Sequence, residues 1–344
     1  LRTPIANFCS SFKTLSPINL VVPVLNAAFE RTRFPKESQC VTVNKVCSSG
    51  MKAIIMGVQA IQLGYRNIVV AGGTESMSTT PFYLPREIPF GGTKIADGIQ
   101  RDGLFDSMVD RPMGYCAEKS VKDFGISRDE QDSYAIESYQ KAQKAWKDGL
   151  FKNEIVSISI SQKGHSVDIH EDEEYNRLNI TKVPLLKPVF VENGTITAAN
   201  ASSLSDGAAI LIMANGQALI DYVKPIAQIL SYAEAGVDPV DFSIAPAIAV
   251  EKMLSKTGIA IDQISLWEIN EAFAMTALVF IKQLNLNKDR VNIRGGAVAL
   301  GHPIGASGAR IVVTLVHALS SGELGVAAIC NGGGEASALL IKKL

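Results

Sequence analysis

Two stretches of this chain, 41–78 and 291–344, contain the same kinds of segments in the same order. Each opens with a β-prone stretch (41–46 and 291–298), followed by a loop with reactive side chains, an apolar helical stretch, a second β-prone stretch and a glycine turn. A repeated order of this kind indicates an internal duplication, in which the two copies form the two halves of one folded unit. No other feature of the sequence limits the possible folds so strongly.

The apolar helical stretches of both copies are hydrophobic nearly all round. The first is MKAIIMGVQAIQL at 51–63, and the second is IVVTLVHAL at 311–319. A helix without a polar face is buried rather than laid on a surface. Two buried helices with strands on either side predict a layered α/β fold, in which the helices lie between two sheets.

The region between the copies is more polar. It is rich in Asp, Glu and Lys, and its pattern predicts one long polar helix over 127–150. We therefore expect this region to cover part of the duplicated unit. The predicted units are an N-terminal half formed by 1–80 and 206–222, a loop domain at 81–205, and a C-terminal half at 223–344.

Composition excludes several classes of protein. The chain has 344 residues, of which 47% are hydrophobic and 19% are charged, and this is typical of a globular enzyme rather than a disordered chain. A formal net charge of −1 gives no overall attraction to nucleic acid or to an anionic membrane. The five cysteines are odd in number and show no metal-ligand spacing, so we expect free thiols in a reducing compartment.

Cys47 is the first candidate catalytic residue. It lies in NKVCSSGMKA, where a β-prone stretch meets the first apolar helix, and the small residues after it would let a substrate approach the backbone. Because a helix N-terminus favours the thiolate, we expect a lowered pKa and a nucleophilic sulfur. The alternative is that Cys47 is a small buried hydrophobic residue.

Three further residues lie at comparable junctions. His302, between Gly301 and Pro303 at the start of the second apolar helix, is a candidate general base. Cys330 ends a β-prone stretch before a glycine turn whose N–H groups could bind an oxyanion, although it could also be a bystander in a tight turn. Asn270 could orient a water molecule or could be a helix cap.

Taken together, these loops resemble those of the thiolase family, and the resemblance covers nearly the whole chain. Four blocks carry it, at 44–51, 270–273, 301–308 and 330–334. Supporting blocks are RTPI from Arg2, GGTESMS from Gly72 and NASSLSDGAA from Asn200. The resemblance implies an α-β-α-β-α fold with two duplicated halves and an inserted loop domain that covers coenzyme A (CoA).

The resemblance also implies a mechanism. Cys47, activated by His302, would carry the acyl group as a thioester, and Cys330 would act as acid and base at the α-carbon of the second acetyl-CoA. His302 and a water held by Asn270 would form one oxyanion pocket. The N–H groups of Cys47 and Gly332 would form the other. The implied reaction is the reversible condensation of two acetyl-CoA molecules to acetoacetyl-CoA and CoA, without a covalently bound cofactor.

Further residues match positions of the potassium-responsive mitochondrial acetoacetyl-CoA thiolases, a branch that also accepts 2-methylacetoacetyl-CoA. The positions that match substrate-binding residues are Arg177, Lys182, Ser202, Phe242 and Met113. The positions that match potassium ligands are Tyr139, Ala198, Ala199, Ala201 and Val298. The branch implies a homodimer or homotetramer in the mitochondrial matrix, with the cytosol as the alternative location, and neither nucleic acid nor a membrane as partner.

The chain departs from the family pattern at three places. A strand and a helix that the family has between 35–37 and the nucleophile loop have no counterpart here. Pro112 replaces a His of the family, and Ser243 replaces a Pro that the branch often has.

Other functions stay open at this point. The chain could be a broad-range 3-ketoacyl-CoA thiolase, or an inactive thiolase-like protein that binds CoA or a partner. A ketoacyl synthase is disfavoured by the second cysteine, Cys330. A dinucleotide-binding site is disfavoured because no GxGxxG motif precedes a helix.

Overall fold

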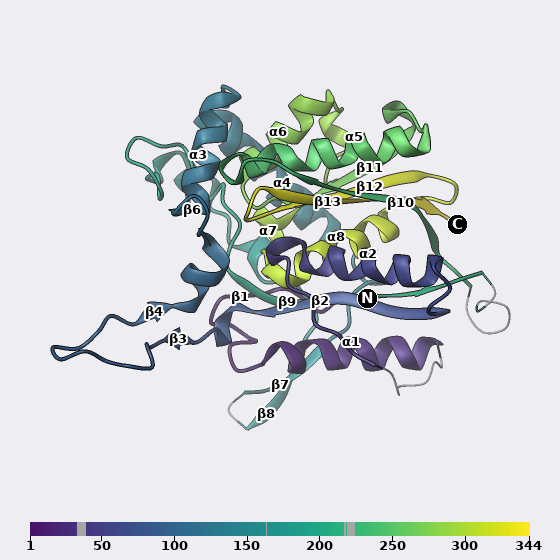
Figure 1. The fold of residues 1–344 in the computed structure, drawn as a ribbon, viewed down its shortest axis with the longest axis horizontal. Helices are drawn as coiled ribbons and strands as arrows, with labels where there is room; N and C mark the ends of the chain where they lie inside the picture. The colour runs from purple at the N-terminus through teal and green to yellow at the C-terminus, as the bar shows by residue number, and fades with distance from the viewer. Residues whose placement is uncertain (33–38, 163, 217, 219–223) are drawn as a thin grey trace.

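The computed structural model describes residues 1–32, 39–162, 164–216, 218 and 224–344. Five layers of helices and sheets are stacked on one another, as the α-β-α-β-α arrangement predicts (Figure 1). From bottom to top in Figure 1 these are helix α1, a three-stranded sheet, helices α2 and α8, a four-stranded sheet, and helices α5 and α6. The layered α/β fold predicted from the sequence is therefore confirmed.

The layers are built from the following elements. The helices are α1 (Pro17–Thr32), α2 (Ser49–Gln62), α5 (Ala245–Thr257), α6 (Ala274–Leu284) and α8 (Ile304–Ala318). The first sheet has the order β1 (Ala6–Asn7), β9 (Ser205–Ala214), β2 (Ile68–Ser76). The second has the order β10 (Ala227–Gly236), β13 (Glu335–Lys343), β12 (Leu324–Asn331), β11 (Ile264–Ile269).

Helices α2 and α8 form the central layer and pack against each other through glycines. A Cβ on Gly50 would lie 2.9 Å from the backbone N of Ala309, and a Cβ on Gly308 would lie 2.6 Å from the backbone N of Met51. Every residue of α8 from Ile304 to Val316 is buried, as its apolar sequence predicts. The same prediction is only half right for α2, because Met56 on its outer side is 39% exposed.

The two sheets differ at one edge, and this explains a wrong prediction. In the second sheet β11 runs parallel to β12, and Val291 makes a parallel bridge to Trp267 of β11. In the first sheet β2 pairs only with β9 among the described strands, and the predicted strand 41–46 is instead irregular backbone leading into a 3₁₀ turn. Residues 41–44 and Gly72–Glu75 line a common cavity of about 450 Å³. A β-prone segment without an adjacent strand has no ladder to join.

The predicted strand 291–298 is also wrong. Only Val291 makes a bridge, and α7 (Ala297–Leu300) begins before the predicted strand ends. The polar helix predicted over 127–150 is confirmed as α4 (Arg128–Lys147). Its N-terminus is fixed by a capping box, in which Ser127 Oγ accepts from the Glu130 N–H and Glu130 accepts from the Ser127 N–H.

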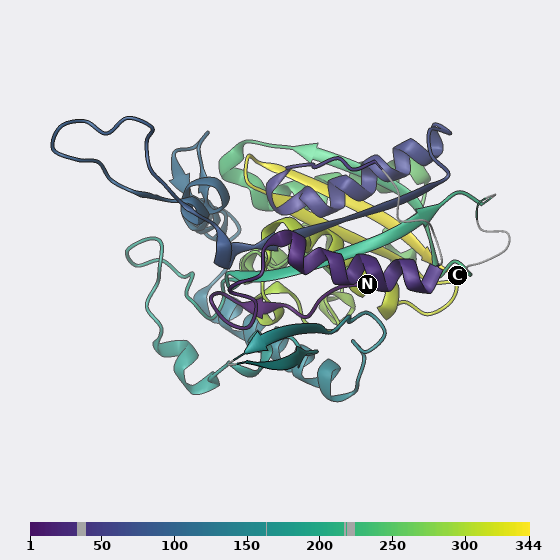
Figure 2. The same ribbon diagram turned by 90° about the horizontal axis from the view of Figure 1, so that it is seen from below.

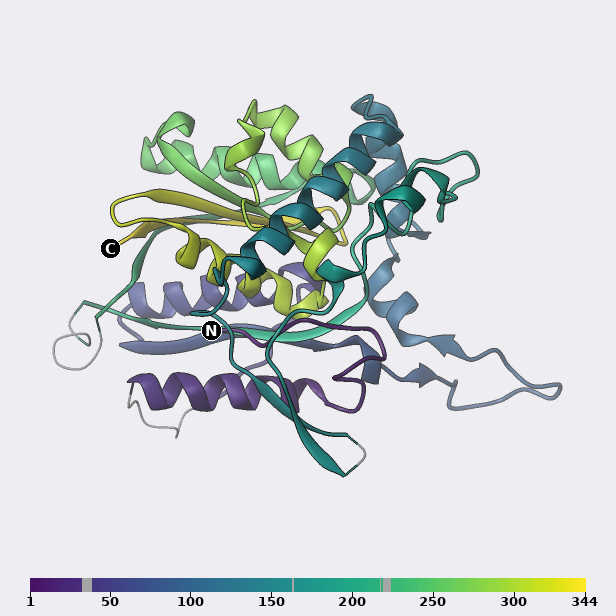
Figure 3. The same cartoon turned by 180° about the vertical axis from the view of Figure 1, so that it is seen from behind.

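The remaining elements belong mainly to the polar region between the halves. Figures 2 and 3 show the hairpin β7–β8 extending from the body, the arm with β3 and β4 reaching away from it, and α4 lying across the back. The elements are β3 (Phe82–Tyr83), β4 (Ala96–Asp97), β5 (Phe105–Asp106), β6 (Arg111–Pro112), α3 (Met113–Asp123), β7 (Ile158–Gln162) and β8 (His165–Ile169). The short helical turns are η1 (Val46–Ser48), η2 (Met77–Thr79), η3 (Ile99–Leu104), η4 (Glu174–Asn176), η5 (Ile180–Leu185), η6 (Pro239–Ile244), η7 (Ile261–Gln263) and η8 (Lys288–Arg290).

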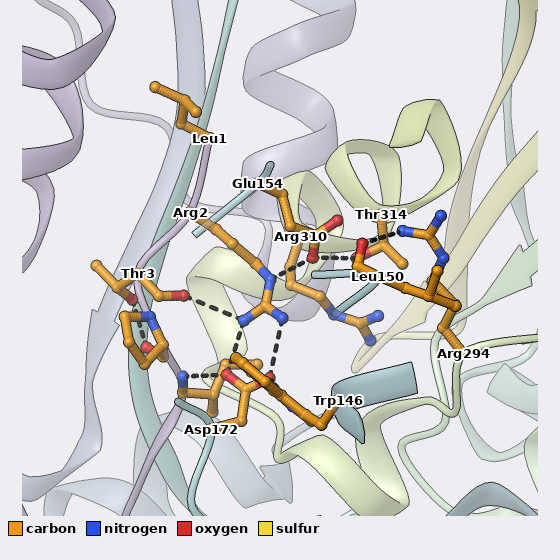
Figure 4. A network of polar contacts seen from close by, with 12 residues as sticks. Leu1, Arg2, Thr3, Trp146, Leu150, Glu154, Asp172, Arg294, Arg310 and Thr314 are labelled. Carbon is orange, nitrogen blue, oxygen red and sulfur yellow. Dashed lines mark hydrogen bonds and ion pairs between the residues drawn. The ribbon is translucent and has the colours of Figure 1, made fainter. Parts of the chain in front are cut away.

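A buried network of charges ties this polar region to the layers (Figure 4). Arg2 Nε donates to Glu154 at 2.6 Å, and Arg2 Nη1 and Nη2 donate to Asp172 at 2.7 and 2.9 Å. Glu154 also accepts from Thr314 of α8 at 3.2 Å. Arg294 donates to the carbonyl of Leu150 at 2.9 Å. The network therefore joins the N-terminal segment, the polar region and the central helix that follows His302.

Within the described residues, no helix is both long enough and apolar enough to span a membrane.

Candidate active site

Cys47 lies in the turn η1, directly before α2. The preceding residue, Val46, has a φ of +49°, which is strained for a β-branched side chain, and its N–H is held by the Asn44 side chain at 3.0 Å. The Ser48 hydroxyl lies 3.4 Å from the carbonyl oxygen of Ile329 on β12. This tight turn brings the nucleophile loop of the first half against the strand that ends at the glycine turn of the second half.

His302 is buried directly before α8, and its hydrogen bonds determine its tautomer. Its Nδ1 lies 2.5 Å from Ser307 Oγ, and that hydroxyl donates its own proton to the Pro303 carbonyl at 2.9 Å. Ser307 must therefore accept from Nδ1–H, so Nε2 carries the free lone pair. Ser307 was missed by the sequence analysis. Its place one turn into the helix, five residues after His302, is the only sequence signal.

Asn270 follows β11 and is fully buried. Its Nδ2 lies 3.4 Å from His302 Nε2, and its Oδ1 has no hydrogen-bond partner among the described residues. The helix-cap alternative is wrong, because α6 begins at Ala274 with Phe273 as its N-cap. A buried acceptor without a partner beside the imidazole fits a water-binding position.

Cys330 is buried near the end of β12, and the glycine turn follows it. The N–H of Gly333 donates to Asp106 Oδ2 at 2.8 Å, which fixes the turn from the side of the polar region. Gly334 has a φ of +74°, and a Cβ there would lie 2.5 Å from the carbonyl oxygen of Val237, so only glycine fits. Asp106 was a second residue missed by the sequence analysis.

These loops meet at the two sulfur atoms. The turn η1 packs against both α8 and β12. The backbone N–H groups of Cys47 and Gly332 both interact with the Cys47 sulfur, and burial, followed by the neighbouring Cys47, raises the pKa of Cys330. The structure therefore brings together Cys47, Gly332 and Cys330, and it places Asn270 beside His302.

The expected lowering of the Cys47 pKa is wrong. Burial raises the pKa of Cys47 to about 12 and outweighs the two N–H groups. Burial, and then the Arg310 guanidinium, lowers the pKa of His302 to about 3. The low-dielectric surroundings thus favour the neutral thiol of Cys47 and the neutral imidazole of His302, because burial disfavours both charged forms.

An apolar wall borders the Cys330 side of the site. Phe242 is 1% exposed and shares a buried cluster with Cys330 and Phe273. Phe273 packs edge-on against Phe242 and Phe190, with ring centroids 6.5 and 5.9 Å apart. Met113 packs against the same cluster, and its sulfur would lie 3.5 Å from a Cβ on Gly332.

The three polar candidates for CoA binding lie in the loop region. Arg177 is mostly exposed and lies 3.5 Å from Glu174, and Lys182 is exposed on η5. Ser202 is half-buried, and its hydroxyl donates to the carbonyl of Ala272 at 2.8 Å. The Arg177 contact thus lies within the loop region, whereas Ser202 reaches the 270–273 loop that also carries Asn270.

The candidate potassium ligands are grouped around α4. Tyr139 donates to Glu174 at 2.8 Å, and α4 packs against both η4 and α7. The loop at 197–201 is tied to α4 by a hydrogen bond from Asn200 to Asp132 at 2.9 Å. Among the described residues outside regular elements, no backbone N–H donates to the carbonyls of Ala198, Ala199 and Ala201, and Val298 lies in α7, which packs against α4.

Comparison with known proteins decides the family. The thiolase N-terminal domain matches residues 22–217, and the thiolase C-terminal domain matches residues 223–343. The chain is a member of the thiolase family.

Individual relatives of this thiolase cover its whole length. It is 47% identical to the mitochondrial acetyl-CoA acetyltransferase of Mus musculus, over 100% of this chain and 90% of the mouse protein. That alignment has 380 positions for 344 residues, so 36 positions of the mouse protein have no counterpart here. The shortfall accords with the segment found missing in the sequence analysis.

Two solved structures are similar to this thiolase. The crystal structure of the Acat5 thiolase of Ascaris suum in complex with coenzyme A has 56% identity and a TM-score of 0.95, covering 100% of this chain and 98% of that one. Human mitochondrial 3-ketoacyl-CoA thiolase has 32% identity and a TM-score of 0.94, covering 100% of this chain and 97% of that one.

Proposed function

We propose that this thiolase is an acetyl-CoA C-acetyltransferase that cleaves acetoacetyl-CoA with CoA and catalyses the reverse condensation. One observation carries the proposal. The N–H groups of Cys47 and Gly332 interact with the Cys47 sulfur, and the carbonyl oxygen of an acyl group bonded to that sulfur would lie within reach of the same two donors. This arrangement supports an acyl group carried on Cys47, with the Cys330 sulfur nearby.

The hydrogen bonds of His302 support two successive roles. Its Nε2 lone pair can take the Cys47 proton as the sulfur attacks the keto carbon of acetoacetyl-CoA. The bond between the keto carbon and the α-carbon then breaks, and the α-carbon takes a proton from Cys330. Protonated Nε2, with a water at Asn270, can stabilise the thioester oxygen of the departing enolate. CoA finally gives its thiol proton to the Cys330 thiolate and attacks the acetyl carbon of acetyl-Cys47. The bond from that carbon to the Cys47 sulfur breaks, the sulfur takes back the proton held on Nε2, and the second acetyl-CoA is released.

The aromatic wall supports a short acyl chain. Phe242 and Phe273 are both buried beside Cys330, and Phe190 packs against Phe273. A long chain would have to displace these rings. Identity points the same way, since this chain is closer to the mouse acetyl-CoA acetyltransferase (47%) than to human 3-ketoacyl-CoA thiolase (32%). A broad-range thiolase would turn over a C16 substrate as fast as acetoacetyl-CoA.

We also propose that potassium binds beside α4. The carbonyls of Ala198, Ala199 and Ala201 accept no backbone N–H among the described residues outside regular elements, and together with the carbonyl of Val298 they are oxygen ligands of the kind that suits this hard monovalent cation. Tyr139 keeps its proton, since burial and Glu174 raise its pKa, and its oxygen is still available as a neutral ligand. When bound, the ion would supply an electrostatic link between the loop at 197–201 and α7, next to Ser202.

Loop-region residues are proposed to bind CoA. Arg177 and Lys182 project from consecutive turns, η4 and η5, and are exposed enough to meet phosphates. Ser202 lies beside the 270–273 loop through its bond to Ala272. We also propose that the chain divides into an N-terminal half (1–80 and 206–222), a loop domain that covers CoA (81–205) and a C-terminal half (223–344).

We further propose a homodimer or homotetramer in the mitochondrial matrix. The arm between β3 and β4 supports assembly, because it extends from the body and exposes Phe90 and Phe82 (Figure 1). The mitochondrial relatives support the location. Light scattering of the purified protein would give the assembly state, and a single-chain mass would contradict the proposal.

A thiolysis assay tests the catalytic proposal. Wild type should consume acetoacetyl-CoA in the presence of CoA, and mass spectrometry should find acetyl on Cys47. Cys47→Ala should abolish both signals. Cys330→Ala should still acetylate when given acetyl-CoA but should lose condensation. Potassium should raise the rate above that in sodium at equal ionic strength, and Tyr139→Phe should reduce the increase.

An inactive CoA-binding thiolase is the second candidate function. The irregular backbone at 41–45 favours it, because these residues lead into the nucleophile loop. The 36 positions of the mouse protein without a counterpart here favour it as well. CoA binding measured by calorimetry without thiolysis at saturating substrate would favour this candidate and would refute the first.

A further inference from the structure

A cluster of charged side chains joins the two halves close to the site. Lys45, two residues before Cys47, donates to Glu335, the residue that follows the glycine turn. Lys45 Nζ also lies 3.6 Å from Glu234 of β10, which accepts from Lys52 of α2 at 2.6 Å. The Lys45 side chain is only 17% exposed. The Glu335 side chain is 45% exposed, so the shielding of the pair from salt comes from the Lys45 side.

The Glu335 carboxylate extends the contact into the turn itself. Asn331 Nδ2 lies 3.4 Å from Glu335 Oε2 and donates to the Gly332 carbonyl at 2.8 Å. Lys45, Glu335 and Asn331 therefore form a continuous chain of contacts from the nucleophile loop to Gly332. The hydrogen bond from Lys45 makes the largest contribution to lowering the pKa of Glu335, so the Glu335 carboxylate is charged at neutral pH.

The position of this chain of contacts matters for the reaction. One oxyanion donor, the Cys47 N–H, belongs to the first half, and the other, the Gly332 N–H, belongs to the second. Asp106 fixes the far side of the turn through Gly333. Lys45 and Glu335 fix the near side, and they do so across the boundary between the halves.

We propose that the Lys45–Glu335 pair is a clasp that sets the spacing between the Cys47 and Gly332 N–H groups, so that both residues are positioning residues for acyl transfer. The inference rests on the proposed acetyltransferase function. A displacement of about 1 Å at a reacting centre can cost about 100-fold in rate. Because Lys45 lies two residues from the nucleophile, loss of the clasp should lower kcat.

Steady-state thiolysis of Lys45→Met and Glu335→Gln tests the clasp. We expect kcat to fall about 10-fold or more in each, with the KM for CoA within about two-fold, because the oxyanion pocket and not the CoA site is disturbed. Lys45→Arg should restore most of the rate. Lys52→Met is the matched control, since Lys52 pairs with Glu234 and acts on Glu335 only through its charge, without a hydrogen bond, and it should keep the wild-type kcat.

Further measurements separate the clasp from a general loss of structure. The double variant Lys45→Met/Glu335→Gln should be no slower than the worse single variant, because both changes break one contact. The melting temperature of each variant should stay near that of wild type. The clasp would be overturned by additive losses in the double variant or by an unchanged kcat in Lys45→Met. It would also be overturned by an equal loss of kcat in Lys52→Met, or by a kcat loss that follows the melting temperature. An inactive wild type would instead refute the proposed function.

Discussion

Replacing Arg2 by Met is expected to reveal how much the buried charge network of Figure 4 stabilises the fold. The change removes three charge-assisted hydrogen bonds, one to Glu154 at 2.6 Å and two to Asp172 at 2.7 and 2.9 Å. It leaves both carboxylates buried. Breaking a buried pair by removing one partner costs about 3–5 kcal/mol.

The remaining contacts place the expected loss at the lower end of that range. Asp172 keeps the Ile5 N–H at 2.6 Å and the Trp146 Nε1–H at 3.2 Å, while Glu154 keeps the Thr314 hydroxyl at 3.2 Å. We therefore expect Arg2→Met to lower the free energy of unfolding in urea by about 3 kcal/mol at neutral pH.

Two comparisons sharpen this measurement. Arg2→Met/Glu154→Gln/Asp172→Asn removes the stranded charges and should be more stable than Arg2→Met alone. Lys144→Met removes an exposed ion pair with Asp148 and should cost less than about 1 kcal/mol. A loss below about 1 kcal/mol in Arg2→Met, or a triple variant no more stable than the single one, would refute the reasoning.

Three other predictions follow from the site and the core. Ser307→Ala should lower kcat by roughly 10- to 100-fold with little change in KM, because His302 loses the acceptor of its Nδ1–H. That hydrogen bond is worth about 1.5–3 kcal/mol. An unchanged kcat in steady-state thiolysis would contradict the assigned tautomer of His302. Glu268 has its pKa raised from 4.5 to about 8 by burial, so the folded state holds a proton there that the unfolded state releases. Stability should therefore fall as pH rises from about 5 to about 8, and Glu268→Gln should flatten that slope in urea titrations, whereas an equal slope in the variant would show that other groups cause it. Gly308→Ala should lower the free energy of unfolding by about 1–3 kcal/mol, since its Cβ would lie 2.6 Å from the Met51 backbone N. Gly236→Ala is the control, because a Cβ there meets nothing within 4 Å. An equal effect of both substitutions would contradict the close contact between the helices.

Local pattern and chemistry carried the sequence predictions that succeeded. The all-round apolar character of 311–319 is a property of the segment itself, and α8 is buried as expected. The loops around Cys47 and His302 could be identified because reactive side chains stand among small residues next to apolar helices, and Cys330 because it ends a β-prone stretch before three glycines.

The predictions that failed depended on neighbours distant in the sequence. Segment 41–46 has β-prone residues, yet a strand also needs an adjacent strand, and the structure places a cavity there. The Cys47 pKa rises because layers from both halves bury the sulfur, an effect that outweighs the local helix. Asp106 reaches Gly333 across 227 residues, so no local pattern could reveal it.

The unequal sheets imply unequal resistance to opening. Strand β12 has a neighbour on both sides, so most of its amide protons are locked in ladders, whereas β2 has a described neighbour only in β9. Outward-facing amides of β2 can exchange with solvent without any unfolding, and β2 can fray while the second sheet stays intact. The free edge of β2 is therefore the place where the first sheet can accept a further strand without any change in the layers beneath it.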